Sequence, residues 1–243
     1  MQSDDQGGAP NPEAPAGAQQ GWLTGLSGCF LSKDTIEKFM ATKPPIINEG
    51  DKPNRNACLH QWSYDLRLGK EAYLSSQKYL QHLDSDRDSI VIEPGEFALL
   101  MTYESVNIPR DCVAFISLRF SYALKGLINI SGFHVDPGYE GKLVFSVYNA
   151  GPNPVVMRYL DPVFMIVFAS LDKPALSRGK EVSFKEITQL KADWISAVKG
   201  PAVSLTRLNS KVERLSQLVN VLIGLVGSLV ATVVIALVLG VRP

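Results

Sequence analysis

The chain has 243 residues, of which 46% are hydrophobic, and its formal net charge is zero. This length suits one domain of moderate size with appendages, and the balanced charge excludes the basic footprint of a nucleic-acid-binding protein. Three widely spaced cysteines, Cys29, Cys58 and Cys112, form no CxxC or zinc-ligand pattern, which indicates a reduced, cytosolic setting.

The first 21 residues are predicted to form a disordered tail. They are rich in Gly, Pro, Ala, Gln and Asp and show no aliphatic periodicity. Such a segment cannot bury enough apolar area to offset the entropy of ordering it. It also lacks the basic and apolar regions of a secretory signal. The folded domain is therefore expected at residues 22–175.

Within this domain, the pattern predicts one short helix followed by β-strands. Ser32 precedes an amphipathic run that ends before Pro44, as expected of an N-capped helix stopped by proline. Apolar or alternating runs bounded by turn residues predict the strands. These runs lie at 63–69, 90–92, 96–100, 143–149 and twice between 154 and 171. The polar segments 46–62 and 75–88 are expected to be loops, and the whole pattern is typical of an all-β barrel.

The central stretch, residues 116–151, holds the candidate site. Its middle is the tight turn VDPGYEG at 135–141, which carries Asp136 and Tyr139. From the residues alone, Asp136 could be a turn residue that bonds backbone N–H groups, so this structural role stays open beside a functional one. We expect His134 to be a surface or interface histidine on a strand and Glu140 to be solvated.

The order and spacing of these motifs resemble the dCTP deaminase and dUTPase superfamily. The resemblance rests on LSKDTIEKFM, SYDLRLG, residues 104–109 and the central turn, and it covers residues 30–172. It implies a mainly β fold, a dUTPase-like distorted β-barrel or jelly roll with a short N-terminal helix, assembled into homotrimers. It also implies a pyrimidine deoxynucleotide ligand, and it assigns four residues to nucleotide binding: Arg119, Ser121, Asp136 and Tyr139.

The phosphate-binding residues of the family are only partly present. Arg119 and Ser121 match the ends of an Arg-Ser-Ser motif, but Phe120 stands in its middle and offers no hydrogen-bond donor. Leu124 stands at the second arginine of the family. Lys125 beside it is expected to point to the other face of a strand.

The catalytic residues of the deaminase branch are also replaced. Ser146 stands where the family has its water-activating glutamate, and a serine with no evident base beside it cannot act as a general base. Ile166 stands near the position of a base-reading glutamine. The zinc nucleoside-deaminase pattern, His-x-Glu with Pro-Cys-x-x-Cys, is absent from the sequence.

The dUTPase branch is matched better. Its water-activating aspartate is retained as Asp136, with Tyr139 at the position of the ring that packs on deoxyribose. By this resemblance, Asp136 is catalytic, and magnesium is a cofactor, only if the protein works like a dUTPase. Otherwise no cofactor and no metal site are expected, because Asp136 and Glu140 alone make a weak magnesium signal.

Residues 176–201 are predicted to be a linker with an amphipathic helix, since apolar residues recur at helical spacing. They are Phe184, Ile187, Leu190, Trp194, Ile195 and Val198. A coiled-coil stalk is predicted at 202–217, where apolar residues recur at alternating steps of three and four as far as Val233. The stalk seam consists of Leu205, Leu208, Val212 and Leu215.

Residues 218–241 carry no charge and are long enough to cross a membrane as a single-pass C-terminal anchor. A fully buried core helix is the alternative. Small residues within the span would allow close helix packing. They are Gly224, Gly227, Ser228 and Ala231. Arg207, Lys211 and Arg214 precede the span and Arg242 alone follows it, so the large domain is expected on the cytoplasmic side.

Three functions are open from the sequence. Phe120, Leu124 and Ser146 favour a catalytically degenerate, trimeric, nucleotide-responsive scaffold, sensor or membrane effector. The second function is an active dCTP deaminase or dUTP pyrophosphatase tethered to a membrane, and Asp136 and Tyr139 favour the pyrophosphatase. In the third, the barrel is purely an oligomerisation module for the membrane helix. The expected partners are other copies of the chain, a membrane and a pyrimidine deoxynucleotide, and no nucleic acid.

Overall fold

The computed structural model describes residues 29–175, 187–198, 205–238 and 240. The predicted N-terminal tail and Phe184 of the linker lie outside these residues. Helix α1 (Lys33–Met40) follows Ser32 as predicted and buries Ile36 and Met40. Because those two residues are four positions apart, they share the face of the helix that packs on the barrel.

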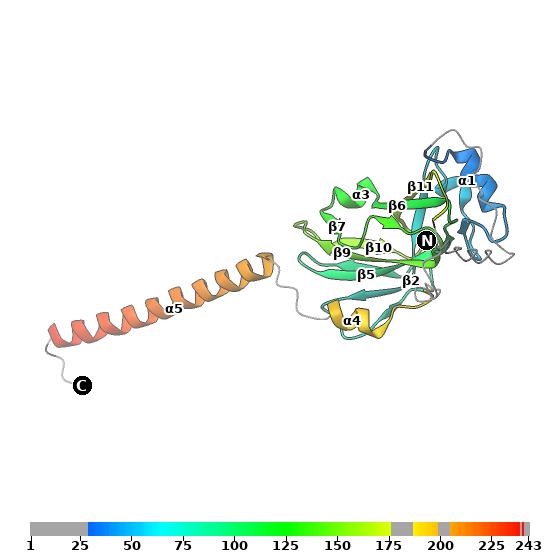
Figure 1. Cartoon of the computed structure of the whole chain (residues 1–243). Helices are drawn as coiled ribbons and strands as arrows, with labels where there is room; N and C mark the ends of the chain where they lie inside the picture. Colours follow the sequence, from blue (N-terminus) through cyan, green and yellow to red (C-terminus); the bar gives the residue numbers. More distant parts are fainter. Residues whose placement is uncertain (1–28, 176–186, 199–204, 239, 241–243) are drawn as a thin grey trace, which may run out of the picture.

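Nine strands of the described chain form a curled antiparallel sheet (Figure 1). The order along its main path is β7-β9-β5-β2-β11-β6-β8, with β1 paired to β5 and β3 paired to β2. These strands are β1 (Ile47–Asn48), β2 (Tyr64–Leu74), β3 (Gln81–His82), β5 (Phe97–Asn107), β6 (Cys112–Leu118), β7 (Leu127–Asn129), β8 (His134–Val135), β9 (Glu140–Asn149) and β11 (Pro162–Ser170). A separate pair joins β4 (Ser89–Ile92) to β10 (Val155–Arg158).

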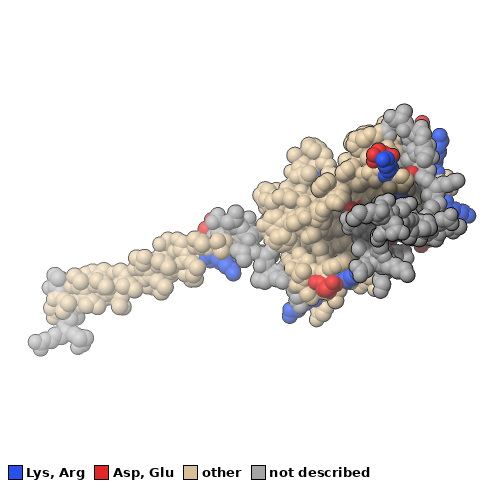
Figure 2. Space-filling view, viewed as in Figure 1, with Lys and Arg blue, Asp and Glu red and all other residues tan. Residues whose placement is uncertain are grey.

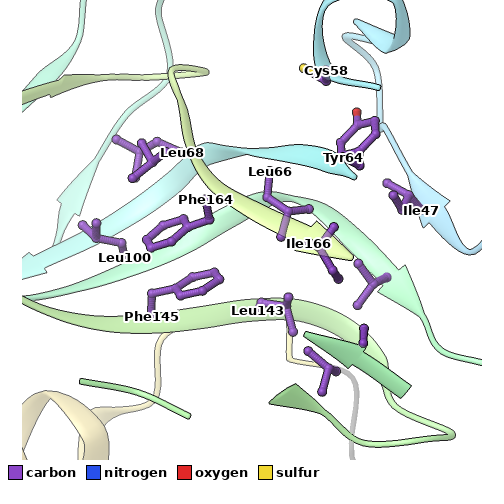
Figure 3. Packing of buried hydrophobic residues seen from close by; sticks show 14 of the residues in the cluster. Ile47, Cys58, Tyr64, Leu66, Leu68, Leu100, Leu143, Phe145, Phe164 and Ile166 are labelled. Carbon is purple, nitrogen blue, oxygen red and sulfur yellow. The ribbon is translucent and has the colours of Figure 1, made fainter. Parts of the chain in front are cut away.

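The core lies inside the curled sheet. Successive side chains of a strand point to opposite faces, so Leu143, Phe145 and Val147 of β9 face inward and are buried. The rings of Phe145 and Phe164 stack with centroids 3.4 Å apart (Figure 3). Because β5 and β2 separate β9 from β11 in the sheet, this contact forms only when the sheet closes on itself. The predicted mainly β, barrel-like fold is therefore confirmed.

A buried ion pair joins β2 to β5 next to the paired residues Leu68 and Thr102. Arg67 Nε lies 2.5 Å from Glu104 Oε1, and the backbone N–H of Arg67 donates to Glu104 Oε2 at 2.8 Å. The two side chains are 3% and 0% exposed. The Tyr103 ring lies 4.7 Å from the guanidinium carbon. Each charge is tolerated in the core because the other lies beside it.

Two local predictions were wrong. The segment 46–62 contains β1 and helix α2 (Arg55–Cys58), because the buried Glu49 carboxylate binds the N–H of Asn54 and the side chain of Arg55. The chain after Arg119 forms helix α3 (Phe120–Ala123) in place of a strand. There the N–H groups of Tyr122 and Ala123 bond to the carbonyl of Arg119 and turn the chain back toward β7.

The same turn gives Lys125 a different place from the one predicted. Its ammonium lies 4.9 Å from the centre of the Tyr122 ring, instead of on the far face of a strand. Gly126 closes the turn with φ +91°, and an added Cβ would lie 2.4 Å from Gly151. Only glycine fits there, since both the positive φ and the close approach exclude a side chain.

The linker helix is shorter than its periodicity predicted. Helix α4 (Ala192–Val198) begins after Leu190, while Ile187 forms a parallel bridge with Gly141. The backbone carbonyl of Ile187 accepts the N–H of Lys142 at 3.1 Å, so tertiary pairing replaces the helix there. Figure 1 shows α4 beside β5 and β2.

Helix α5 (Leu205–Val238) is one unbroken helix of 34 residues that projects from the barrel (Figure 1). Within it, Lys211–Leu237 has a mean hydropathy of 2.5 and is 0% buried, so the rest of the described chain does not cover it. It is one candidate membrane span by length and composition. Figure 2 shows its charged residues confined to the end nearer the barrel. The seam residues Leu208, Val212 and Leu215 are exposed in the single chain, and their pairing stays a prediction.

Candidate functional site

A cavity of about 360 Å³ lies beside β8 and the turn that follows it. Its volume is in the range of small-molecule sites. Most of its lining is apolar. The lining residues are Ile116, Ser131, Gly132, His134, Val135, Asp136, Tyr139, Leu143, Val144, Ile187 and Trp194.

The turn at Asp136 is held rigidly against the end of β5. Gly138 has φ +80°, which favours glycine, and the Tyr139 N–H closes the turn on the Asp136 carbonyl at 3.2 Å. Two further backbone bonds of 2.8 Å tie the turn to Ile108, one from the Gly138 N–H and one into the Tyr139 carbonyl. The Asp136 side chain is therefore presented from a fixed backbone.

Asp136 and His134 form a pair at the cavity. His134 Nε2 lies 3.4 Å from Asp136 Oδ1, and both side chains are partly exposed. Asp136 is the one carboxylate among the lining residues. A solvent-accessible carboxylate beside an imidazole can accept a proton from water and pass it to the imidazole. His134 is exposed, as expected of a surface or interface histidine, and it also lines the cavity.

Tyr139 supplies a buried ring to the same cavity. Its hydroxyl donates to the carbonyl of Lys142, which fixes the ring in one orientation. Burial raises the pKa of Tyr139 to about 12, so the phenol stays neutral at physiological pH. The ring is placed to contact a ligand by packing rather than by proton transfer.

The other two predicted binding residues do not line this cavity. Arg119 Nε lies 3.3 Å from Asp65 Oδ2, and His60 Nε2 lies 2.9 Å from the same oxygen. Ser121 is exposed on α3. Within one chain, Arg119 is thus bound by a carboxylate that competes with any phosphate.

The replaced family positions are also apart from the cavity. Phe120 and Leu124 are 78% and 74% exposed on α3. Ser146 lies on β9, where its backbone carbonyl accepts the N–H groups of Ile130 and Ser131 at 2.8 and 3.3 Å. Ile166 is fully buried in the core, so its side chain is not available to a ligand.

The described part of the chain brings together no group of three or more His, Cys, Asp or Glu side chains suited to a metal ion. Glu140 is exposed, as predicted, and it does not line the cavity.

Sequence reasoning missed the residues that complete the cavity and hold its surroundings. The helical spacing of Ile187 and Trp194 indicated a packed face but not its position beside Asp136. The turn pattern could have drawn attention to Ser131 and Gly132, which precede β8. No sequence pattern indicated that Asp65 is the partner of Arg119, because only the pairing of distant strands brings the two residues together.

Comparison with known proteins identifies the family of this barrel. A family model described as dCTP deaminase-like matches residues 30–171, more than half of the chain. The chain belongs to the dCTP deaminase-like family. Its curated relatives include the dCTP deaminase of Pyrococcus abyssi, 34% identical over 125 residues, which cover 51% of this chain and 78% of that protein. The dCTP deaminase of Thermococcus kodakarensis is 36% identical over 124 residues, 51% of this chain and 77% of that protein.

Among solved structures, the 2'-deoxycytidine 5'-triphosphate deaminase from Agrobacterium tumefaciens is similar, with a TM-score of 0.49 and 18% sequence identity. The match covers 58% of this chain and 49% of that enzyme, so this chain spans about half of its length. Outside the barrel, the family match does not include α4 or α5.

Proposed function

We propose that this protein binds a pyrimidine deoxynucleoside triphosphate in the cavity and acts on it as a dCTP deaminase or dUTP diphosphatase, while α5 holds it at a membrane. The observation that carries the proposal is the Asp136–His134 pair, 3.4 Å apart at the wall of a ligand-sized cavity. The activity named for the curated relatives, dCTP deaminase, supports the substrate class.

In either reaction, Asp136 takes a proton from water as the general base, and His134 stabilises the charge beside it. For dCTP, the resulting hydroxide adds to C4 of cytosine and the proton held by Asp136 passes to N3. The proton of the new C4 hydroxyl then passes to the amino group, which leaves as ammonia, and dUTP is formed. For dUTP, the hydroxide attacks the α-phosphorus, pyrophosphate leaves and dUMP is formed. Tyr139 would pack against the nucleoside in both cases.

A second candidate function is nucleotide binding without turnover. It is favoured by Ser146 and Leu124, which stand where the family resemblance places a catalytic glutamate and a phosphate-binding arginine. In this case, the same cavity would make the protein a nucleotide-responsive scaffold, sensor or membrane effector.

We further propose that the barrel assembles with copies of itself, as the resemblance to trimeric proteins implies. Large exposed apolar side chains gather on α3, β7 and the following loop, and such a patch on a soluble surface marks an interaction site. They are Phe120, Leu124, Ile128, Ile130 and Phe133. Cytoplasmic placement of the barrel is proposed from Lys211 and Arg214, the basic residues at the start of the apolar span.

One experiment separates these functions. The full chain in nanodiscs is incubated with dCTP and dUTP, products are separated by anion-exchange chromatography, and nucleotide binding is measured by calorimetry. Turnover that is lost in Asp136→Asn and kept in Glu140→Gln supports the enzyme. Binding without turnover supports the scaffold. If neither nucleotide binds, both proposals are wrong and the barrel is a structural module.

A further inference from the structure

One wall of the cavity comes from outside the family domain. Ile187 and Trp194 line the cavity together with Asp136, His134 and Tyr139, yet the family match ends at residue 171. Both residues belong to the segment Ile187–Val198, called here the docking segment. Barrel and docking segment therefore share a single cavity.

The docking segment is attached to the barrel at defined points. The Lys142 N–H donates to the Ile187 carbonyl at 3.1 Å, and the Leu190 N–H donates to Glu71 Oε2 at 2.7 Å. Leu190 is 8% exposed and is the member of the segment that reaches full burial. It belongs to a second apolar cluster, apart from the main core, with Tyr73, Leu99 and Met101.

The remaining contacts of the docking segment are looser. Trp194, Ile195 and Val198 are only partly buried against the second cluster, and Lys191 covers the Trp194 ring at 4.9 Å from its centre. A segment with one buried anchor and few bonds lies at the low end of local stability. Additional contacts from a ligand would therefore shift its docking equilibrium measurably.

The docking segment also leads directly into the membrane helix. Residues 199–204 alone separate Val198 from Leu205, where α5 begins. The contacts that hold α4 on the barrel therefore also limit where α5 can begin.

We infer that the docking segment is part of the ligand site, and that occupancy of the cavity and docking of the chain that leads to α5 stabilise each other. A ligand in the cavity contacts Ile187 and Trp194 only while the segment is docked. Binding and docking are then thermodynamically linked, and each strengthens the other by the same factor. This inference rests on the proposed function for the identity of the ligand, a pyrimidine deoxynucleotide.

The test undocks the segment without altering the lining of the cavity. Leu190→Asp places a charge in the second apolar cluster, and Leu190 does not line the cavity. Ser196→Asp adds the same charge on the exposed face of α4 and is the matched control. The full chain is studied in nanodiscs, with Trp22→Phe and Trp62→Phe introduced so that Trp194 is the one fluorescent tryptophan.

Two readouts are taken with dCTP and with dUTP. The dissociation constant should rise in Leu190→Asp by a factor of roughly 5 to 150, the usual range of coupling between sites, and stay unchanged in Ser196→Asp. Nucleotide should shift the Trp194 emission and slow hydrogen exchange at 187–198 in the control but not in Leu190→Asp. Circular dichroism confirms that both variants keep the barrel.

The outcomes separate this inference from the function on which it rests. If nucleotide binds with equal affinity to both variants, the coupling is wrong and the proposed function stands. If nucleotide binds but leaves exchange at 187–198 unchanged, the coupling is also wrong. If neither nucleotide binds to the parent chain, the proposed function fails and the inference fails with it.

Discussion

At the scale of single residues, Asp136 is the proposed general base of the cavity. Asp136→Asn keeps the size of the side chain but removes its capacity to accept a proton. Turnover should fall by about 10²- to 10⁴-fold, the usual contribution of a general base, while nucleotide affinity changes little. Product chromatography with dCTP and dUTP measures the effect. Glu140→Gln, in the same turn but outside the cavity, should keep full activity.

Retained turnover in Asp136→Asn would assign proton transfer to another group. His134, 3.4 Å away, would then be the next candidate.

Glu104 is the residue whose loss should harm the fold most. Glu104→Ala leaves the Arg67 guanidinium buried without its carboxylate, and we expect a loss of about 3–5 kcal/mol in the free energy of unfolding. Urea denaturation of the full chain in detergent measures it. The double variant Arg67→Met, Glu104→Leu should cost much less, because it removes both charges together. Equal losses in the single and double variants would show that packing, not charge, governs this position.

Tyr139 should make the barrel sensitive to alkaline pH. Its pKa is about 12 in the folded chain against an ordinary value of 10.0. A raised folded-state pKa gives stability that is present below the unfolded value and lost as pH rises from there through the folded value. The free energy of unfolding should therefore fall between pH 10.0 and about pH 12. In Tyr139→Phe this fall should be shallower, whereas Tyr79→Phe, at an exposed position, should leave it unchanged.

Residues that share a turn could be predicted together, and residues joined by tertiary pairing could not. Asp136 and Tyr139 were expected in one site because the same turn carries both. Arg119 was expected beside them from the family motif, but in one chain Asp65 of β2 binds it. No local pattern records that contact, because it depends on how β2 lies in the sheet.

At the scale of elements, the spacing of apolar residues predicted strands and helices correctly where that spacing is regular over many residues. Helix α1, strands β2, β4, β5, β9, β10 and β11, and the unbroken α5 all fall where predicted. Helix α3 replaces a predicted strand and α4 is shorter than predicted, since hydrogen bonds to Arg119 and from Lys142 set their bounds. Short elements are governed by such contacts more than by propensity.

Helix α5 should pack against α5 of other copies of the chain along the seam residues Leu205, Leu208, Val212 and Leu215. Leu208→Asp with Leu215→Asp should abolish this association while leaving the barrel and membrane insertion intact, because a charge at a seam position cannot be packed. Oxidative cross-linking of Val212→Cys, in a background where Cys29→Ser removes the exposed native thiol, measures it. Cross-linking that persists in the double variant would show that Leu208 and Leu215 are not needed for this association.

At the scale of the whole molecule, assembly should belong to the barrel. A chain lacking residues 218–243 should be soluble and should still form trimers, because the exposed apolar patch on α3 and β7 remains to be covered. Light scattering after size-exclusion chromatography gives the mass directly. Ile128→Asp in the same truncated chain should yield monomers. If the truncated chain without Ile128→Asp is already a monomer, the contacts that hold the trimer together belong to α5 and not to the barrel.

The sequence predicted a mainly β barrel, one short N-terminal helix and a long apolar C-terminal helix. It did not predict the order of strands in the sheet or the position of α4. Both depend on contacts between residues far apart in the chain, such as the stacking of Phe145 on Phe164. The docking of α4 beside the cavity is likewise a property of the assembled fold.

The length of α5 sets how far the barrel can stand above the hydrocarbon core of a membrane. At about 1.5 Å per residue its 34 residues extend about 51 Å, whereas the hydrocarbon core of a bilayer is only about 30 Å thick. With the apolar end embedded, about 20 Å of helix stands above the hydrocarbon and carries Lys211 and Arg214 through the headgroup layer. In the proposed membrane-bound state, the barrel is thereby held clear of the lipid, so a nucleotide in bulk water reaches the cavity without crossing the membrane surface.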